Sequence, residues 1–196
     1  TRAKKLPTVL TEDEQERFLE QTNPRYPTGE RNQTMLRLML NTGLRLAEMT
    51  ALKWRDIDLT TGKLMVRQGK GSKDRTLWVA EADIDRLRSW RARQATVCNT
   101  YEHVFTTLKG KPLGHRYVQR MVKRYAAKAG IDKNISPHTL RHSFATDLYR
   151  ETSKIRLVQK VLGHSDLSTT MIYTHIFDEE VETALKSFRQ AAAVAV

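Results

Sequence analysis

The sequence predicts a mostly helical domain with one small antiparallel sheet, an α+β fold, and three observations lead to this prediction. Apolar residues recur at helical spacing over most of the chain, as in the run Met35, Leu36, Met39 and Leu40. One stretch, residues 57–79, instead alternates with a period of two and is interrupted by turn-forming residues. A length of 196 residues, with 39% hydrophobic residues, is enough for one domain with a substantial core.

Start and stop signals place the helices in order along the chain. Thr11 and Glu14 have the spacing of a capping box, so a helix should begin there. A loop that contains Pro24, Pro27 and Gly29 is expected to follow this helix. The remaining helices are expected at residues 31–43, 46–53, 84–95, 118–129, 138–150, 154–162 and 180–191.

Three short alternating runs predict the sheet. They lie at residues 57–59, 64–66 and 77–79. Thr61-Gly62 separates the first two runs, and the glycine-containing segment 69–74 separates the last two. Short runs joined by such turns are typical of neighbouring antiparallel strands, so we expect a three-stranded meander.

The chain is strongly basic. It has 34 Lys and Arg residues against 22 Asp and Glu, a formal net charge of +12 and a pI near 10.0. Such a field attracts polyanions, of which nucleic acid is the first candidate and an anionic membrane surface the second. No apolar run approaches the roughly 20 residues of a membrane span, and no signal peptide opens the chain. The lone Cys98 excludes a disulfide framework and a cysteine metal site, so we expect a cytoplasmic location.

A histidine and an arginine share one face of a predicted helix. Pro137 suits the first helical position, with Ser136 as its N-cap, and His138 and Arg141 follow three residues apart. A cation and an imidazole near a helix N-terminus suit a phosphate. By itself the motif is weak, because a histidine and an arginine on a helix are more often surface or capping residues.

Two further motifs place cations at turns. Arg45 opens a helix after Gly43, and Glu48 lies one turn further on, where it could hold the guanidinium or simply form a surface ion pair. Lys70 lies in Gly69-Lys70-Gly71 between two predicted strands, in a turn that could place it against a phosphate or be an ordinary solvated hairpin tip.

The fourth motif runs from residue 162 to residue 175. Gly163 is expected to end a helix, and Ser168 to cap a short helix that carries Tyr173. His164 and Tyr173, nine residues apart, bracket this segment. A buried tyrosine with a satisfied hydroxyl is the simpler interpretation of Tyr173 alone.

Taken in order, these motifs resemble the tyrosine recombinase (phage integrase) family, and residues 162–175 resemble the nucleophile region of its Xer-like members. The resemblance extends from about residue 8 to residue 186. It implies the fold of DNA breaking–rejoining enzymes, with residues 1–8 as a linker remnant, 9–177 as the catalytic domain and 178–196 as a C-terminal helix and tail. The family's N-terminal DNA-clamping domain is not in this sequence, so we expect a part of a longer recombinase. The resemblance implies six active-site groups, namely Arg45, Lys70, His138, Arg141, His164 and Tyr173, with Glu48 at a common acidic position beside them.

Site-specific recombination through a 3′-phosphotyrosine intermediate is the activity that the resemblance implies. Arg45, Arg141 and His164 would hold the nonbridging oxygens, where charge builds up during in-line attack. Tyr173 would be the nucleophile, His138 its base and Lys70 the proton donor to the leaving oxygen. The phosphotyrosine keeps the bond energy for rejoining, so no ATP, metal or other cofactor is expected.

Double-stranded DNA is the expected partner, which would place the protein at the nucleoid. Lys73 and Arg75 are candidate contacts to DNA phosphates, although plain solvation fits them equally well. From residue 179, Leu185 and Phe188 belong to an apolar helical stripe. The stripe either packs on its own domain or, as the resemblance implies, docks into a neighbouring copy within a homotetramer on paired sites.

Three rival functions share some of these features. A type IB topoisomerase-like enzyme uses the same Arg, Lys, His and Tyr chemistry, but the Leu-Gly-His164 motif favours a recombinase. A basic DNA-binding module would not need all six polar groups. A metal nuclease could use Asp56 and Asp58 on one face of a strand, although solvation of an edge strand explains them more simply.

Overall fold

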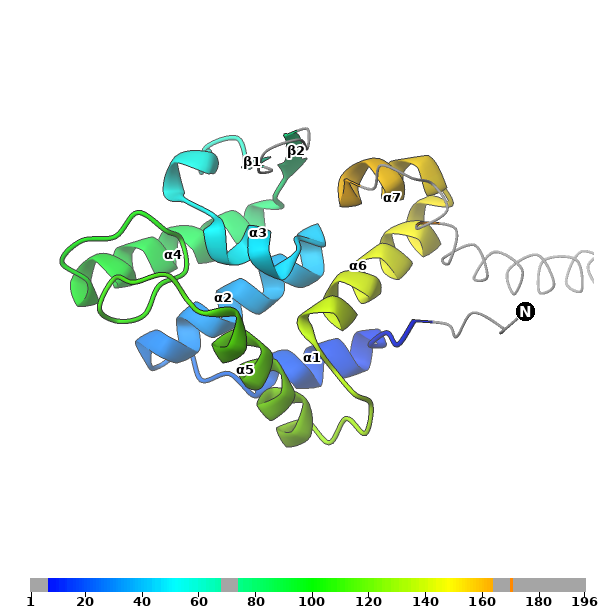
Figure 1. Ribbon diagram of the computed structural model, residues 1–196, viewed down its shortest axis with the longest axis horizontal. Helices are drawn as coiled ribbons and strands as arrows, with labels where there is room; N and C mark the ends of the chain where they lie inside the picture. The colour runs from blue at the N-terminus through cyan, green and yellow to red at the C-terminus, as the bar shows by residue number, and fades with distance from the viewer. Residues whose placement is uncertain (1–6, 68–73, 164–169, 171–196) are drawn as a thin grey trace, which may run out of the picture. The chain divides into compact units, whose positions relative to one another are not determined.

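The computed structural model describes residues 7–67, 74–163 and 170, and it divides the chain into two compact units (Figure 1). The first unit is Thr8–Phe144, and the second combines Thr1–Pro7 with Ala145–Val196. The fold is mostly helical with one small antiparallel sheet, as expected. The elements in chain order are α1 (Glu12–Glu20), α2 (Pro27–Thr42), α3 (Leu46–Ala51), η1 (Trp54–Asp56), β1 (Lys63–Val66), β2 (Arg75–Trp78), α4 (Glu81–Val97), α5 (His115–Lys128), α6 (Pro137–Thr152) and α7 (Ile155–Leu162).

The first two helices begin with different signals. The capping box expected at α1 is confirmed, because Thr11 Oγ1 accepts from the Glu14 amide and Glu14 Oε2 accepts from the Thr11 amide. The expectation of a loop through Gly29 is wrong, since α2 begins at Pro27. A proline at the first helical position gives up no hydrogen bond, because that N–H has no partner inside the helix.

The sheet has two strands in the described part of the chain rather than three. β1 and β2 pair antiparallel, with Leu64 opposite Leu77. The expected first strand is reduced to a single bridge between Ile57 and Leu64. The 3₁₀-helix η1 ends immediately before Ile57, and the Asp58 carboxylate immediately after it accepts from the amides of Thr60 and Thr61. Only one residue between these two turns is therefore left to pair.

Helix α2 forms the centre of the first unit, where α1 and α4 pack against it. Polar groups in this core are hydrogen-bonded: Trp90 Nε1 donates to the Val104 carbonyl at 2.7 Å, and the buried Gln94 side chain joins Trp54 to Thr106. Such pairing removes the desolvation penalty of burying polar atoms. The fully buried side chains include Phe18, Met35, Leu36, Leu38, Met39, Met49, Leu64, Trp90 and Phe105.

The second unit contains the last two turns of α6 and all of α7 in its described part. Helix α7 ends at Gly163, whose φ of 65° is the left-handed conformation that favours glycine. This confirms the helix predicted for residues 154–162 to within one residue. Among the described helices, none is both long and apolar enough to cross a membrane.

Candidate active site

Arg45 is presented by a sharp turn between α2 and α3. Gly43 adopts a φ of 63° at the end of α2, and Arg45 then serves as the N-cap of α3. Arg45 Nη1 donates to Glu48 Oε1 at 2.9 Å, and its backbone amide donates to Glu48 Oε2 at 2.8 Å. The Arg45 side chain is 40% exposed, so its guanidinium is anchored on one side and still reaches solvent.

Glu48 also receives a second arginine, from strand β2. Arg75 Nη1 and Nη2 donate to Glu48 Oε1 and Oε2 at 2.8 and 2.9 Å, which is a bidentate pair. Burial by itself raises the pKa of Glu48, but the hydrogen bonds from Arg75 and Arg45 outweigh it and lower the pKa to about 2. From the sequence, Arg75 fitted contact with DNA phosphates and plain solvation equally well. Its side chain is instead only 9% exposed and pairs with Glu48.

Arg141 connects α6 to the turn that carries Arg45. The start of α6 is as predicted, with Ser136 Oγ accepting from the Thr139 amide. Arg141 follows in the second turn, is 3% exposed, and donates from Nη1 to the Gly43 carbonyl. Because Gly43 is two residues before Arg45, this hydrogen bond brings the two arginines of the predicted set to one place.

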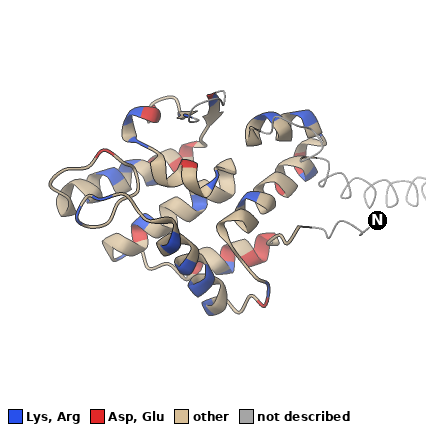
Figure 2. Cartoon of the chain, viewed as in Figure 1, with Lys and Arg blue, Asp and Glu red and all other residues tan. Residues whose placement is uncertain are grey.

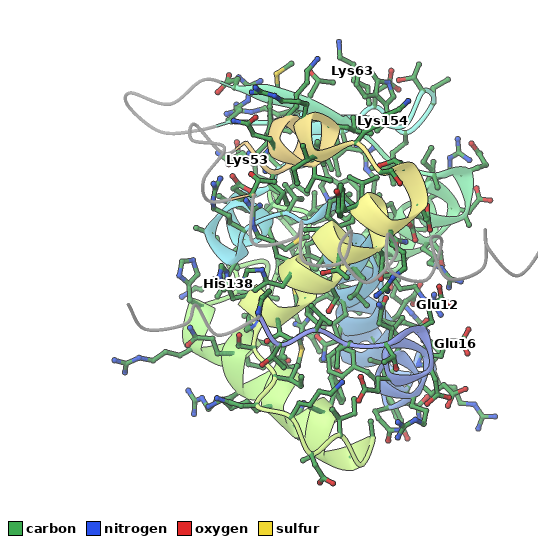
Figure 3. All side chains as sticks on the ribbon, turned by 90° about the vertical axis from the view of Figure 1, so that its right-hand side faces the viewer. Glu12, Glu16, Lys53, Lys63, His138 and Lys154 are labelled. Atoms are coloured by element: carbon green, nitrogen blue, oxygen red, sulfur yellow. The ribbon has the colours of Figure 1, made fainter. Side chains whose placement is uncertain are left out.

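His138 lies at the start of α6 (Figure 3). The positive charges of Arg141 and Arg45 act on its imidazole. Its pKa is lowered from the ordinary value of 6.5, mainly by burial and further by the positive charges of Arg141 and Arg45. The imidazole is therefore neutral at pH 7 and able to accept a proton. We placed His142 away from the site, but its ring packs edge-on against His138 with centroids 4.3 Å apart.

The structure thus brings together three of the six predicted groups, all within the first unit. They come from the α2–α3 turn and from the start of α6. Two guanidiniums and a neutral imidazole can bind a phosphate dianion or phosphodiester and accept a proton beside it. Lys70, Lys73, His164 and Tyr173 lie outside the described residues.

The two aspartates considered for a metal nuclease are each bound to protein groups. Asp56 is buried and accepts from Arg67 Nε at 2.6 Å, while Asp58 closes the turn before β1. Among the described residues, no three or more His, Cys, Asp or Glu side chains are grouped so that they could hold a metal ion.

Helix α5 presents a row of cations that the sequence analysis overlooked. Its first residue, His115, contacts Thr50 of α3, with 3.0 Å between His115 Nε2 and Thr50 Oγ1. Helix α5 therefore begins beside α3, the helix that follows the turn carrying Arg45. In Figure 2 several segments of this helix are coloured blue, as Lys and Arg. Its 14 residues contain no Asp or Glu, and this is the signal that could have identified it. The cations are Arg116, Arg120, Lys123, Arg124 and Lys128.

Comparison with known proteins gives a consistent result. The model of the phage integrase family matches residues 8–180. The chain is 42% identical over 173 residues to tyrosine recombinase XerC of Xanthomonas axonopodis pv. citri (strain 306), covering 88% of this chain and 55% of the relative. It is 37% identical over 195 residues to tyrosine recombinase XerD of Staphylococcus saprophyticus, and this match covers 96% of this chain and 65% of the relative. The chain therefore spans between about half and two thirds of these relatives.

Solved structures agree with this family relationship. The crystal structure of XerA recombinase aligns with a TM-score of 0.81 at 32% identity, over 95% of this chain and 67% of that one. The crystal structure of the XerH site-specific recombinase bound to a palindromic difH substrate is a post-cleavage complex. It aligns with a TM-score of 0.80 at 33% identity, over 94% of this chain and 54% of that one. The catalytic domain of bacteriophage HP1 integrase, at 23% identity and a TM-score of 0.64, shares the fold.

The first prediction concerns the charge of Glu48. Glu48→Gln keeps the shape of the side chain but removes the negative charge that accepts both Nη donors of the buried Arg75, so the free energy of unfolding at pH 7 should fall by about 3 kcal/mol. The pKa of Glu48 is lowered to about 2 in the folded state, below the ordinary value of 4.5. Its contribution is thus complete above about pH 4.5 and is lost as the pH falls towards 2. Urea unfolding at several pH values should show the two proteins converging over that interval.

Glu102→Gln is the matched control. Glu102 pairs with Lys53 on the surface and is 57% exposed, so its loss should cost less than about 1 kcal/mol. Two results would contradict the assignment of a charged, buried Glu48. One is an equal loss of unfolding free energy in both variants, and the other is a loss in Glu48→Gln that does not change with pH.

Proposed function

Because this chain belongs to the phage integrase family, we propose that it is the catalytic part of a site-specific DNA recombinase. Residues 9–177 would cleave and rejoin strands through a covalent 3′-phosphotyrosine, and residues 178–196 would contact a neighbouring copy. The observation that carries the proposal is the grouping of Arg45, Arg141 and His138 around the α2–α3 turn. The remainder of the protein would supply a further clamp on DNA.

In the proposed reaction the Tyr173 hydroxyl attacks the phosphorus in line with the leaving 5′-oxygen. His138 takes the phenolic proton, the new Tyr173 O–P bond forms, and the P–O5′ bond breaks while Lys70 protonates the departing oxygen. Arg45, Arg141 and, by resemblance, His164 donate to the nonbridging oxygens, on which negative charge builds up. Binding that strengthens as this charge grows lowers the barrier rather than merely holding the substrate.

The cations of α5 support a path for the duplex beside this site. The helix is about 21 Å long at 1.5 Å per residue, and it begins next to α3. Arg116, Arg120 and Lys123 point from its outward face, opposite the buried Val118, Val122 and Tyr125. In the described part of the chain none of the three has an acidic partner. Unpaired cations at this spacing suit successive backbone phosphates.

Assembly through the C-terminus is the second part of the proposal. The apolar stripe with Leu185 and Phe188 follows Tyr173 directly in the sequence. Docking of this stripe into a neighbouring copy would link the active sites of a homotetramer on paired DNA sites. That link could determine which Tyr173 is poised to attack.

Tyr173→Phe tests the nucleophile. The change removes one oxygen and little packing, so folding and DNA binding should persist while cleavage is lost. The measurement is the amount of denaturation-resistant protein–DNA adduct that forms on suicide duplexes, whose sequences are taken from the chain's own genomic neighbourhood. Tyr101→Phe, the same change elsewhere, should leave the adduct intact. An adduct formed by the Tyr173→Phe variant would refute the assignment.

Lys70 can be tested through the leaving group. If Lys70 protonates the 5′-oxygen, Lys70→Ala should slow cleavage by roughly 10²–10⁴-fold on ordinary DNA. A substrate with sulfur at the bridging 5′ position should restore the rate, because a thiolate leaves without a proton. Equal slowing on both substrates would assign Lys70 to charge or positioning instead.

The C-terminal stripe is tested by Leu185→Glu combined with Phe188→Glu. Two buried charges should abolish assembly on paired sites, while thermal melting of the isolated chain stays within a few degrees of wild type. Ser187→Glu with Gln190→Glu adds the same charge opposite the stripe and should leave assembly unchanged in sedimentation. Unfolding of the first variant as a monomer would show that the stripe packs on its own domain.

A further inference from the structure

A cavity lies at the start of α2, at the opposite end of that helix from the candidate active site. Its volume is about 410 Å³, within the range of small-ligand pockets. Helix α2 has 16 residues, so the cavity at its start and Arg45 after its end are separated by about 24 Å. Two cations and three tyrosines are among the lining residues, and none of those residues is acidic. They are Gln21, Asn23, Tyr26, Thr28, Gly29, Asn32, Tyr117, Arg124, Tyr125 and Lys128.

A buried guanidinium lies behind the wall of this cavity. Arg31 is 2% exposed and donates to the Thr106 carbonyl, to Asn32 Oδ1 and to the Tyr117 hydroxyl at 2.8, 2.8 and 2.5 Å. Burial lowers the pKa of Arg31, yet a guanidinium remains charged in a folded protein. All of these partners are neutral. An uncompensated buried cation favours negative charge nearby.

The hydrogen bonds of this network run in one direction, towards the cavity. The Tyr117 hydroxyl accepts from Arg31, and the Tyr125 hydroxyl accepts from Asn32 Nδ2 at 3.0 Å. Each phenol therefore has its own proton left to donate, and the described residues provide no acceptor for either proton. Both phenols line the cavity, Tyr125 at 6% exposed and Tyr117 at 37% exposed. Two phenolic donors that line one cavity suit a ligand rich in acceptor atoms.

We propose that this cavity binds a phosphate group. The Tyr117 and Tyr125 hydroxyls would donate to its oxygens, and Arg124 and Lys128 would balance its charge; neither cation has an acidic partner in the part of the chain that the structure describes. The first turn of α2 adds to this field, because Tyr26 provides no side-chain cap and Thr28 and Gly29 line the cavity. A phosphate accepts all of these hydrogen bonds and donates none.

The nearest source of such a phosphate is the DNA duplex, and this part of the inference rests on the proposed function. The cavity side of α5 adjoins its outward face, since Arg124 lies one helical turn from Arg120. A strand whose successive phosphates follow the cations of α5 away from Arg45, about 6 Å apart, would reach the cavity about 4 nucleotides from the cleaved phosphate. A free phosphorylated small molecule is the other source with the same chemistry.

Binding of inorganic phosphate to the DNA-free chain tests the cavity itself. Amide NMR signals of Gly29, Asn32 and Tyr125 should shift saturably, and Arg124→Gln with Lys128→Gln should weaken the affinity at least about tenfold. Arg120→Gln with Lys123→Gln removes equal charge from the outward face and should change the affinity by less than about twofold. No saturation in the wild type, or equal loss in both variants, would overturn the proposal.

Ethylation interference on the suicide duplex distinguishes the two sources. If DNA supplies the phosphate, ethylation about 4 nucleotides from the cleavage point should weaken wild-type binding but not binding by the Arg124→Gln, Lys128→Gln variant. Phosphate binding without this interference assigns the cavity to a free phosphorylated molecule. The adduct at Tyr173 is scored separately, so failure of the recombinase proposal does not affect the phosphate titration, which needs no DNA.

Discussion

Glu48 allows two guanidinium groups to lie side by side, because its single carboxylate accepts hydrogen bonds from Arg75 on β2 and from Arg45 at the start of α3. Without that negative charge the two arginines would repel each other, and Arg75 would lose its bidentate partner. The same carboxylate accepts from the Arg45 amide, which fixes the first turn of α3. Strand β2, the start of α3 and Arg45, the arginine proposed to bind phosphate, are therefore held by one side chain.

Charge is distributed unevenly over the first unit, because some cations pair with carboxylates and others do not. Arg17, Arg67, Arg88 and Lys133 each pair with a carboxylate. The cations of α5 have no such partner in the described chain. Exposed ion pairs contribute little to stability, so the paired cations mainly limit the local field. The unpaired row determines where a polyanion would bind most strongly.

The helical fold was predictable because burial imposes a period on the sequence, and the helix starts were predictable where a cap is local. The helix at Glu12–Glu20 shows this, since Thr11 and Glu14 both belong to one turn. The start of α2 was misjudged because proline and glycine suggest a loop unless the buried packing of Gly29 is known; a Cβ there would lie 1.7 Å from the Asn23 carbonyl oxygen. Arg75 was misjudged for a similar reason. Its partner Glu48 is 27 residues away, and pairing over such a distance leaves no local pattern.

The grouping of cations around His138 also affects the timing of proton transfer. In the free protein Arg141 and Arg45 help to keep the imidazole neutral, which makes it available as a base. A bound phosphodiester opposes their charge, and the additional negative charge of the pentacoordinate state opposes it further. In the proposed reaction the pKa of His138 would therefore rise as the attacking bond forms, and the imidazole would hold the proton more firmly as the reaction proceeds. The ring of His142 packs edge-on against His138, so it lies beside the imidazole whose charge would change.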